Sequence, residues 1–249
     1  MSTSELSITK RRLLGGIAIA AVSMALTACS DAEDKAASAE ANPAVSNETT
    51  ASTTPAVEIP TADRDVDMEA ALKPGPLKEM ALGDPNAPVK VIEYMSMTCP
   101  HCAHFHENTF EAIKTKYVDT GKVYFVLREF PFPQDTASLA AFMLARCTTE
   151  DKFFPFVSMF LKQQRTWAAP SDGDVRNAML QLSKLGGFTQ ETFDACLTNA
   201  QLAGDVSAVR DRGAQEFGVQ STPTFLINGK AYSGDMSVDT MSALIDSLL

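Results

Sequence analysis

The stretch "PVKVIEYMSMTCPHCAHFHE", residues 88–107, decides the fold. Its first part, residues 88–95, has the β-branched and aromatic residues and the partial alternation that are typical of a strand. Two cysteines, Cys99 and Cys102, follow where that strand ends. Pro100 lies between them and suits the first turn of a helix, because its fixed φ is already helical. The stretch therefore predicts a strand, a short loop and a helix with Cys99 at its N-terminus.

The helix is expected to continue to residue 116, because its apolar residues are spaced to form one buried face: Phe105, Phe110, Ile113 and Tyr117. Gly121 ends it, and "KVYFVLREF", residues 122–130, predicts a second strand. A strand, helix and strand in this order favour two parallel strands joined by a right-handed crossover.

Residues 134–204 are helical in pattern and predict a helical subdomain inserted in the middle of the chain. Ser171, with Asp174 three residues on, is a candidate N-cap, and Thr189 is a second one, flanked by Phe188 and Phe193. A further helix is expected to reach residue 217. A hairpin should follow, with a strand at 224–227, a turn at Asn228-Gly229 and a returning strand, and then a last helix over 238–248. Together, these strands and helices predict a two-layer α/β unit with a helical insertion.

The two cysteines are expected to differ in reactivity. At a helix N-terminus, the thiolate of Cys99 faces unpaired N–H groups and the positive end of the helix dipole, which lower its pKa and make it the candidate nucleophile. Cys102 lies one turn further in and is the candidate resolving thiol. A protonated His101 would add positive charge near Cys99. Stabilising the reduced form makes the disulfide a stronger oxidant, so the pair should oxidise other thiols.

Three other interpretations of the cysteine pair compete with thiol-disulfide exchange. A c-type haem needs His directly after the second cysteine, and residue 103 is Ala. Zinc has four candidate ligands in Cys99, Cys102, His104 and His106, but 104 and 106 point about 200° apart on a helix, so both cannot face one site. A purely structural disulfide stays open as an alternative. We expect no metal and no cofactor, and we interpret His104 and His106 as surface residues.

The N-terminal part of the chain is predicted to export and anchor the protein. Basic residues 10–12 precede an uncharged run over 13–28, as in a secretory signal peptide spanning 1–28. The run ends in "LTAC", which resembles the lipobox of bacterial lipoproteins, with Cys29 as the lipidated residue. The Arg11-Arg12 pair weakly resembles a twin-arginine signal, and the general export route is favoured. Residues 29–75 are interpreted as the lipidated N-terminus and a disordered tether, because they hold few large apolar residues.

Composition excludes one class of partner. The formal net charge of the chain is -10 at pH 7. Nucleic-acid binding rests on Lys and Arg that neutralise phosphates, so we expect no nucleic-acid partner.

Together, "VIEYMSMTCPHCAHF" and "GVQSTPTFLINGKAYSG" resemble the thioredoxin-fold thiol-disulfide oxidoreductases of the DsbA type over nearly all of the domain predicted at residues 76–249. The Cys-Pro-His-Cys sequence is the one typical of the oxidising branch. The resemblance identifies Pro223 as the cis-proline of the family, and Thr222 as the residue that offers its backbone to an extended substrate. It also identifies Glu93 as the buried acid that helps move the proton of Cys102.

Two further cysteines, Cys147 and Cys196, lie in the helical insertion. An even number of cysteines remains after lipidation and the active pair are set aside. In an oxidising compartment this favours a structural Cys147–Cys196 disulfide over two buried free thiols.

The predicted function is a dithiol oxidase that introduces disulfides into unfolded exported polypeptides. The resemblance implies a periplasmic enzyme, here anchored through Cys29, and a quinone-linked membrane protein of the DsbB type that reoxidises it. We expect a monomer, because residues 30–75 are too poor in apolar residues to build the dimerisation domain of the isomerases. A disulfide reductase or isomerase, and a non-catalytic peptide-binding lipoprotein, stay open as alternatives. The clients and the choice between inner and outer membrane stay open too.

Overall fold

The computed structural model describes residues 57–249. The predicted signal peptide, Cys29 and most of the predicted tether lie outside the described residues. Within the described part of the chain, no helix is both long enough and apolar enough to span a membrane.

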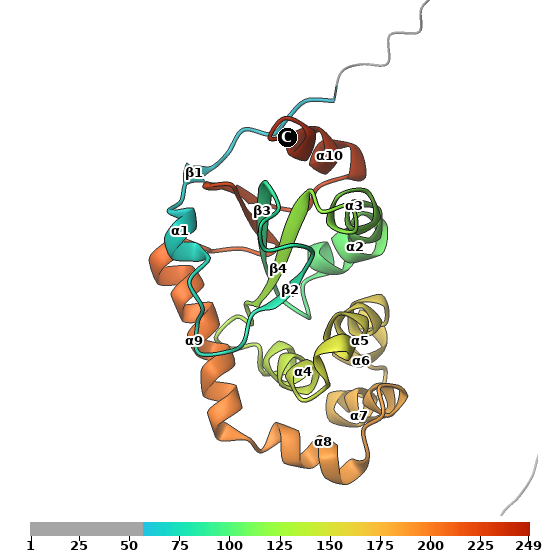
Figure 1. The fold of residues 1–249 in the computed structure, drawn as a ribbon. Coiled ribbons are helices and arrows are strands. Elements are labelled where there is room, and N and C mark those ends of the chain that lie inside the picture. The colour runs from blue at the N-terminus through green and yellow to red at the C-terminus, as the bar shows by residue number, and fades with distance from the viewer. Residues whose placement is uncertain (1–56) are drawn as a thin grey trace, which may run out of the picture. The chain divides into compact units, whose positions relative to one another are not determined.

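A six-stranded mixed sheet forms the centre of the domain, in the order β1-β6-β5-β3-β4-β2 (Figure 1). The central strand β3 (Val89–Met95) runs parallel to β4 (Val123–Glu129), as predicted. On its other side β3 pairs antiparallel with β5 (Thr224–Ile227), which forms the predicted hairpin with β6 (Lys230–Ser233). The outer positions are held by β1 (Arg64–Asp65) and β2 (Met80–Leu82), both antiparallel to their neighbours.

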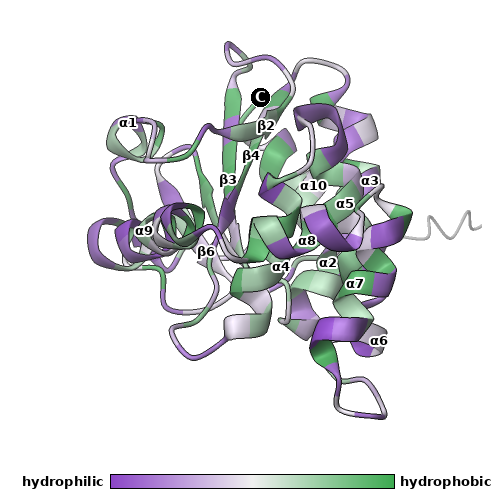
Figure 2. Cartoon of the chain, turned by 90° about the horizontal axis from the view of Figure 1, so that it is seen from below, coloured by the Kyte–Doolittle hydropathy of each residue, from purple (hydrophilic) through white to green (hydrophobic). Residues whose placement is uncertain are grey.

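Helices cover both faces of this sheet (Figure 1). One face packs against α1 (Met68–Ala71) and the C-terminal part of α9 (Ala200–Phe217). Helix α9 comes close to the sheet at Gly213, where an added Cβ would meet the Tyr94 ring at 2.6 Å. The other face packs against α2 (Pro100–Asn108), α3 (Phe110–Ile113) and α10 (Val238–Asp246). The central strands are accordingly apolar, whereas the helices present polar residues on their outer sides (Figure 2).

The helix predicted from Pro100 is divided rather than continuous. It is interrupted at Thr109, which has φ −119° and ψ −47° and lies between α2 and α3. The hydroxyl of Thr109 is buried and donates a hydrogen bond of 2.8 Å to the carbonyl oxygen of Met236. A π-helical turn, η1 (Lys114–Val118), then ends the segment. The break ties this part of the chain to the segment before α10.

The middle of the chain forms the predicted helical insertion. Its helices are α4 (Thr136–Arg146), α5 (Glu150–Lys162), α6 (Gln164–Ala168), α7 (Val175–Leu185) and α8 (Gln190–Leu197). The predicted disulfide is present: Cys147 at the end of α4 is bonded to Cys196 in α8 across a sequence separation of 49 residues. Closing a loop of this length stabilises a fold by about 2–4 kcal/mol. The thioredoxin-like fold with an inserted helical subdomain is therefore confirmed.

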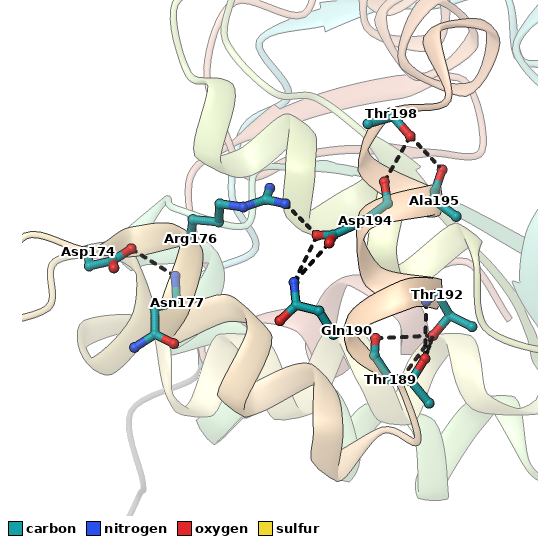
Figure 3. Close-up of polar contacts among 9 residues, drawn as sticks. All are labelled: Asp174, Arg176, Asn177, Thr189, Gln190, Thr192, Asp194, Ala195 and Thr198. Carbon is teal, nitrogen blue, oxygen red and sulfur yellow. Dashed lines mark hydrogen bonds and ion pairs between the residues drawn. The ribbon is translucent and has the colours of Figure 1, made fainter.

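Side-chain caps begin α7 and α8 (Figure 3). Thr189 is the N-cap of α8, as predicted, and forms a capping box with Thr192. The expectation that Ser171 caps the preceding helix is wrong. Asp174 is the N-cap, and its carboxylate accepts a hydrogen bond of 2.9 Å from the backbone N–H of Asn177. The intervening residues form a turn at Gly173, whose φ of +76° is incompatible with a helix.

The predicted boundary between tether and domain at residue 75 is also wrong, because the folded domain begins earlier. The backbone N–H of Asp63 donates a hydrogen bond to the carbonyl of Ala231, and β1 then extends the sheet. Arg64 donates two hydrogen bonds to the carbonyl oxygen at the end of α9, and Ala71 is fully buried. Backbone pairing, the Arg64 side chain and a few apolar residues packed against the core hold this segment, so composition alone did not reveal it.

Candidate active site

Strand β3 and helix α2 place the two cysteines as predicted. Cys99 is the N-cap residue of α2, with φ −75° and ψ 120°, and Pro100 occupies the first turn. Both thiols are free, Cys99 being half-buried and Cys102 fully buried inside the first turn. The structure therefore presents one accessible sulfur and one covered sulfur at the N-terminus of a helix.

Hydrogen bonds lower the pKa of Cys99 to about 5. The largest contribution is a hydrogen bond from the Cys102 thiol, which outweighs the opposing effect of partial burial. The side chain of Thr222 and the backbone N–H groups of Cys102 and His101 lower this pKa further. Cys99 is therefore a thiolate at neutral pH, which is the form that attacks disulfides and forms mixed disulfides.

Cys102 has the opposite character. Burial raises its pKa well above the ordinary value for cysteine, and the neighbouring Cys99 and the negative charge of Glu93 raise it further. Cys102 therefore keeps its proton at neutral pH. A sulfur that leaves or attacks at this position must gain or lose a proton inside the protein.

Thr222 and Pro223 lie beside the reactive sulfur. The peptide bond between them is cis, as the resemblance implied. The sulfur of Cys99 is 3.2 Å from the Thr222 carbonyl oxygen, and the buried Thr222 hydroxyl has no hydrogen-bond partner. The loop before β5 thus brings backbone within contact distance of Cys99, although the two segments are 123 residues apart.

The three histidines of the chain lie in different surroundings, although all belong to α2. His101 is exposed, and its backbone N–H is the group that acts on Cys99. His104 is exposed and hydrogen-bonded to Asp235 at 2.7 Å, which agrees with the predicted surface position.

The prediction of a surface position for His106 is wrong. His106 is buried, and its Nε2 atom lies 2.9 Å from Oε2 of Glu93. The error has a geometric reason, since residues 104 and 106 point to opposite sides of a helix and only one of them can be exposed here. A usable indication was present, because His106 follows Cys102 by four residues and therefore shares its buried face. Glu93 is fully buried, as the resemblance implied.

Sequence reasoning missed the residues that hold the loop before Cys99. The Ser138 hydroxyl accepts a hydrogen bond of 3.0 Å from the backbone N–H of Met97, and Asp135 is hydrogen-bonded to the Thr98 hydroxyl. From the helical insertion, the side chain of Gln164 donates to the carbonyl oxygens of Met97 at 2.9 Å and Cys99 at 3.0 Å. These contacts join residues 37 to 67 positions apart, so no local pattern could reveal them.

A groove of about 410 Å³ lies next to the cysteine pair, between α2 and α6, and its lining includes Pro100, His104 and Leu161. A larger hollow of about 710 Å³ lies between β2, α3 and α5 and is not lined by the active-site loop. Among residues 57–249, no group of three or more His, Cys, Asp or Glu side chains is placed to hold a metal ion.

Comparisons with known proteins agree with this geometry. The family model described as thioredoxin matches residues 77–247. A putative protein-disulfide oxidoreductase of Rickettsia conorii is 35% identical over 172 residues. That alignment covers 69% of this chain and 60% of the relative, so the match spans less than two thirds of the Rickettsia protein.

Two further relatives are matched over more of their length. A probable disulfide bond formation protein D of Bacillus cereus is 29% identical, with 69% of this chain and 79% of that protein aligned. The crystal structure of Wolbachia pipientis alpha-DsbA1 has 29% identity and a TM-score of 0.65, and covers 72% of this chain and 94% of that one. The chain belongs to the thioredoxin family, among its DsbA-type members.

Proposed function

We propose that the protein is a thiol-disulfide oxidoreductase that oxidises pairs of thiols in other polypeptides through Cys99 and Cys102. One observation carries the proposal: a half-buried, accessible sulfur with a pKa of about 5 lies beside a fully buried sulfur whose pKa is raised. The low pKa of Cys99 stabilises the dithiol form relative to the disulfide. A stabilised dithiol form gives a higher reduction potential, and hence an oxidant.

The reaction proceeds by two exchanges. A substrate thiolate attacks the Cys99 sulfur of the disulfide form, the bond between Cys99 and Cys102 breaks, and its electron pair goes to Cys102, which takes up a proton. A second substrate thiolate then attacks the substrate sulfur of the mixed disulfide, and Cys99 leaves as a thiolate. The substrate gains one disulfide and loses two electrons, and the protein holds both as the dithiol.

The setting of this activity is part of the proposal. The clients are newly exported, unfolded polypeptides, whose extended backbone pairs beside Thr222 and Pro223. The enzyme acts as a monomer in the periplasm, anchored through a lipid on Cys29. A quinone-linked membrane protein of the DsbB type returns it to the disulfide form. The names of the relatives, which include a probable disulfide bond formation protein, support the class of reaction.

The potential of the Cys99–Cys102 pair, measured by equilibration with glutathione, tests the direction of electron flow. We expect a value well above that of the glutathione couple, together with oxidation of a reduced, unfolded model protein. The Cys99→Ser variant should lose this activity. Cys102→Ser, incubated with oxidised glutathione, should accumulate the mixed disulfide between Cys99 and glutathione, because the resolving thiol is missing. A potential near the roughly -270 mV of thioredoxin would identify a reductase instead. Failure of the disulfide to react with thiols at all would indicate a peptide-binding protein.

A further inference from the structure

Glu93 and His106 form a buried acid–base pair. The positions of Cys99 and Cys102 do not by themselves explain why these two side chains are buried together. Both side chains are almost completely excluded from solvent, with exposed fractions of 0% and 2%. They share one hydrogen bond of 2.9 Å between Oε2 and Nε2. The second carboxylate oxygen of Glu93 and the Nδ1 atom of His106 have no other partner. Burying two such groups costs folding free energy unless they are fully hydrogen-bonded, and here one polar atom of each has no partner. The pair therefore does not serve stability.

The surroundings leave His106 as the polar neighbour that holds the Glu93 side chain. On the sheet, Glu93 lies between Leu127 of β4 and Phe225 of β5, which are both apolar. The imidazole of His106 packs against the rings of Phe105 in α2, at 5.5 Å, and Phe110 in α3, at 4.7 Å between ring centres. These apolar neighbours lower the local dielectric constant and so strengthen the one hydrogen bond that joins the two side chains.

Few other titratable groups face the pair. Cys102 lies one turn before His106 on α2, and the negative charge of Glu93 acts on its thiol. On β4, Glu129 lies two residues beyond Leu127 on the same face, and it is held by Arg146 from α4. Arg128 points to the opposite face, where it is hydrogen-bonded to Tyr94 and Glu79. Of the buried polar side chains that the structure describes, only Glu93 is hydrogen-bonded to His106.

We propose that His106 is a positioning residue that holds the Glu93 carboxylate near Cys102 and shares with it the proton that Cys102 exchanges during turnover. The inference rests on the proposed function and concerns the one atom of that reaction that solvent cannot reach, the Cys102 sulfur. His106 itself does not touch the sulfur-bound substrate, and it acts through Glu93.

The proton moves between Cys102 and the buried pair in both directions of the reaction. When the bond between Cys99 and Cys102 breaks, the electron pair stays on Cys102, and the pair formed by Glu93 and His106 gives this sulfur its proton. When Cys102 later attacks during reoxidation, the proton returns to the pair. The Glu93 carboxylate and the His106 imidazole are joined by a hydrogen bond of 2.9 Å and are excluded from solvent. A proton taken from Cys102 can therefore be held between them without reaching solvent.

The test is the rate at which the disulfide form reacts with glutathione, measured across pH 5–9 and divided by the concentration of glutathione thiolate. For the unchanged protein, this normalised rate should fall as pH rises, because loss of the shared proton removes the donor to Cys102. In His106→Gln an amide N–H still reaches Glu93, but the side chain cannot titrate. We expect a rate at pH 7 that is lower by about tenfold or more, and a pH profile displaced by at least about one unit.

His104→Gln is the matched control. His104 lies on the same helix and is also hydrogen-bonded to a carboxylate, but it is exposed. Its profile should superimpose on that of the unchanged protein. A profile of His106→Gln that also superimposes would overturn the inference and leave the proposed function standing. If the unchanged protein itself does not react with glutathione, the proposed function fails and this inference fails with it.

A second measurement needs no folded variant. The chain has three histidines, so nitrogen NMR of the imidazole rings in the unchanged protein can follow each of them. We expect the His106 ring of the disulfide form to titrate with the same midpoint as the normalised rate. A His106 ring that does not change between pH 5 and 9 would contradict a shared proton.

Discussion

At the scale of single residues, Cys102 controls the acidity of Cys99. The hydrogen bond from the Cys102 thiol is the largest cause of the pKa of about 5 at Cys99. Cys102→Ala removes this donor and should raise the pKa of Cys99, whereas Cys102→Ser retains a hydroxyl donor and should raise it less. The rate of alkylation of Cys99 by iodoacetamide as a function of pH measures both values. Midpoints in both variants that match that of the unchanged protein would assign the low pKa to the helix N-terminus instead.

At the scale of elements, the helical insertion supports the active-site loop through Gln164 of α6. In Gln164→Ala the buried carbonyl oxygen of Met97 loses its side-chain donor, and Cys99 keeps only its helical hydrogen bond from Ala103. Leaving a buried acceptor unpaired costs about 1–3 kcal/mol, so urea unfolding should show a loss of this size. Arg165→Ala, exposed on the same helix, serves as the comparison and should change stability by less than about 0.5 kcal/mol. If Gln164→Ala lowers the free energy of unfolding no more than Arg165→Ala does, the insertion does not hold the loop.

The elements also show how far the sequence could predict this protein. Strands β3 and β4, the hairpin of β5 and β6 and the place of Cys99 at a helix start follow from local patterns, because burial repeats along each element. Strand β1 could not be predicted, since two residues held by backbone pairing leave no pattern. The contact of His106 with Glu93 and that of Gln164 with the loop depend on how separate elements pack. Such contacts are a property of the tertiary fold.

At the scale of the whole molecule, the stability of the dithiol form should depend on pH. The pKa of Cys99 is about 5 in the folded protein and about 8.5 in an unfolded chain, so folding favours the thiolate. This contribution is complete above the unfolded pKa and is lost as pH falls through the folded pKa. The thiol of Cys102 does not titrate in this window, because its pKa is raised.

In the disulfide form Cys99 has no thiol to titrate. Comparing the stabilities of the two redox forms therefore isolates the contribution of the Cys99 thiolate. The free energy of unfolding of the dithiol form, minus that of the disulfide form, should increase from pH 5 to pH 8 when both are measured in urea. One equivalent of dithiol prepares the dithiol form and leaves the Cys147–Cys196 bond in place. The Cys99→Ser variant forms no Cys99–Cys102 disulfide, and its free energy of unfolding should follow the pH dependence of the disulfide form rather than that of the dithiol form. Parallel stability curves for the two forms of the unchanged protein would contradict a folded-state pKa near 5.

The two outermost strands of the sheet are the shortest, with two residues in β1 and three in β2. An exposed strand edge is a template on which another chain can pair and begin to aggregate. Under the proposed function the protein acts on unfolded polypeptides, whose own backbone groups are unpaired. Short edges offer these chains few hydrogen bonds, so the protein could hold a client by one sulfur atom and release it without nucleating aggregation.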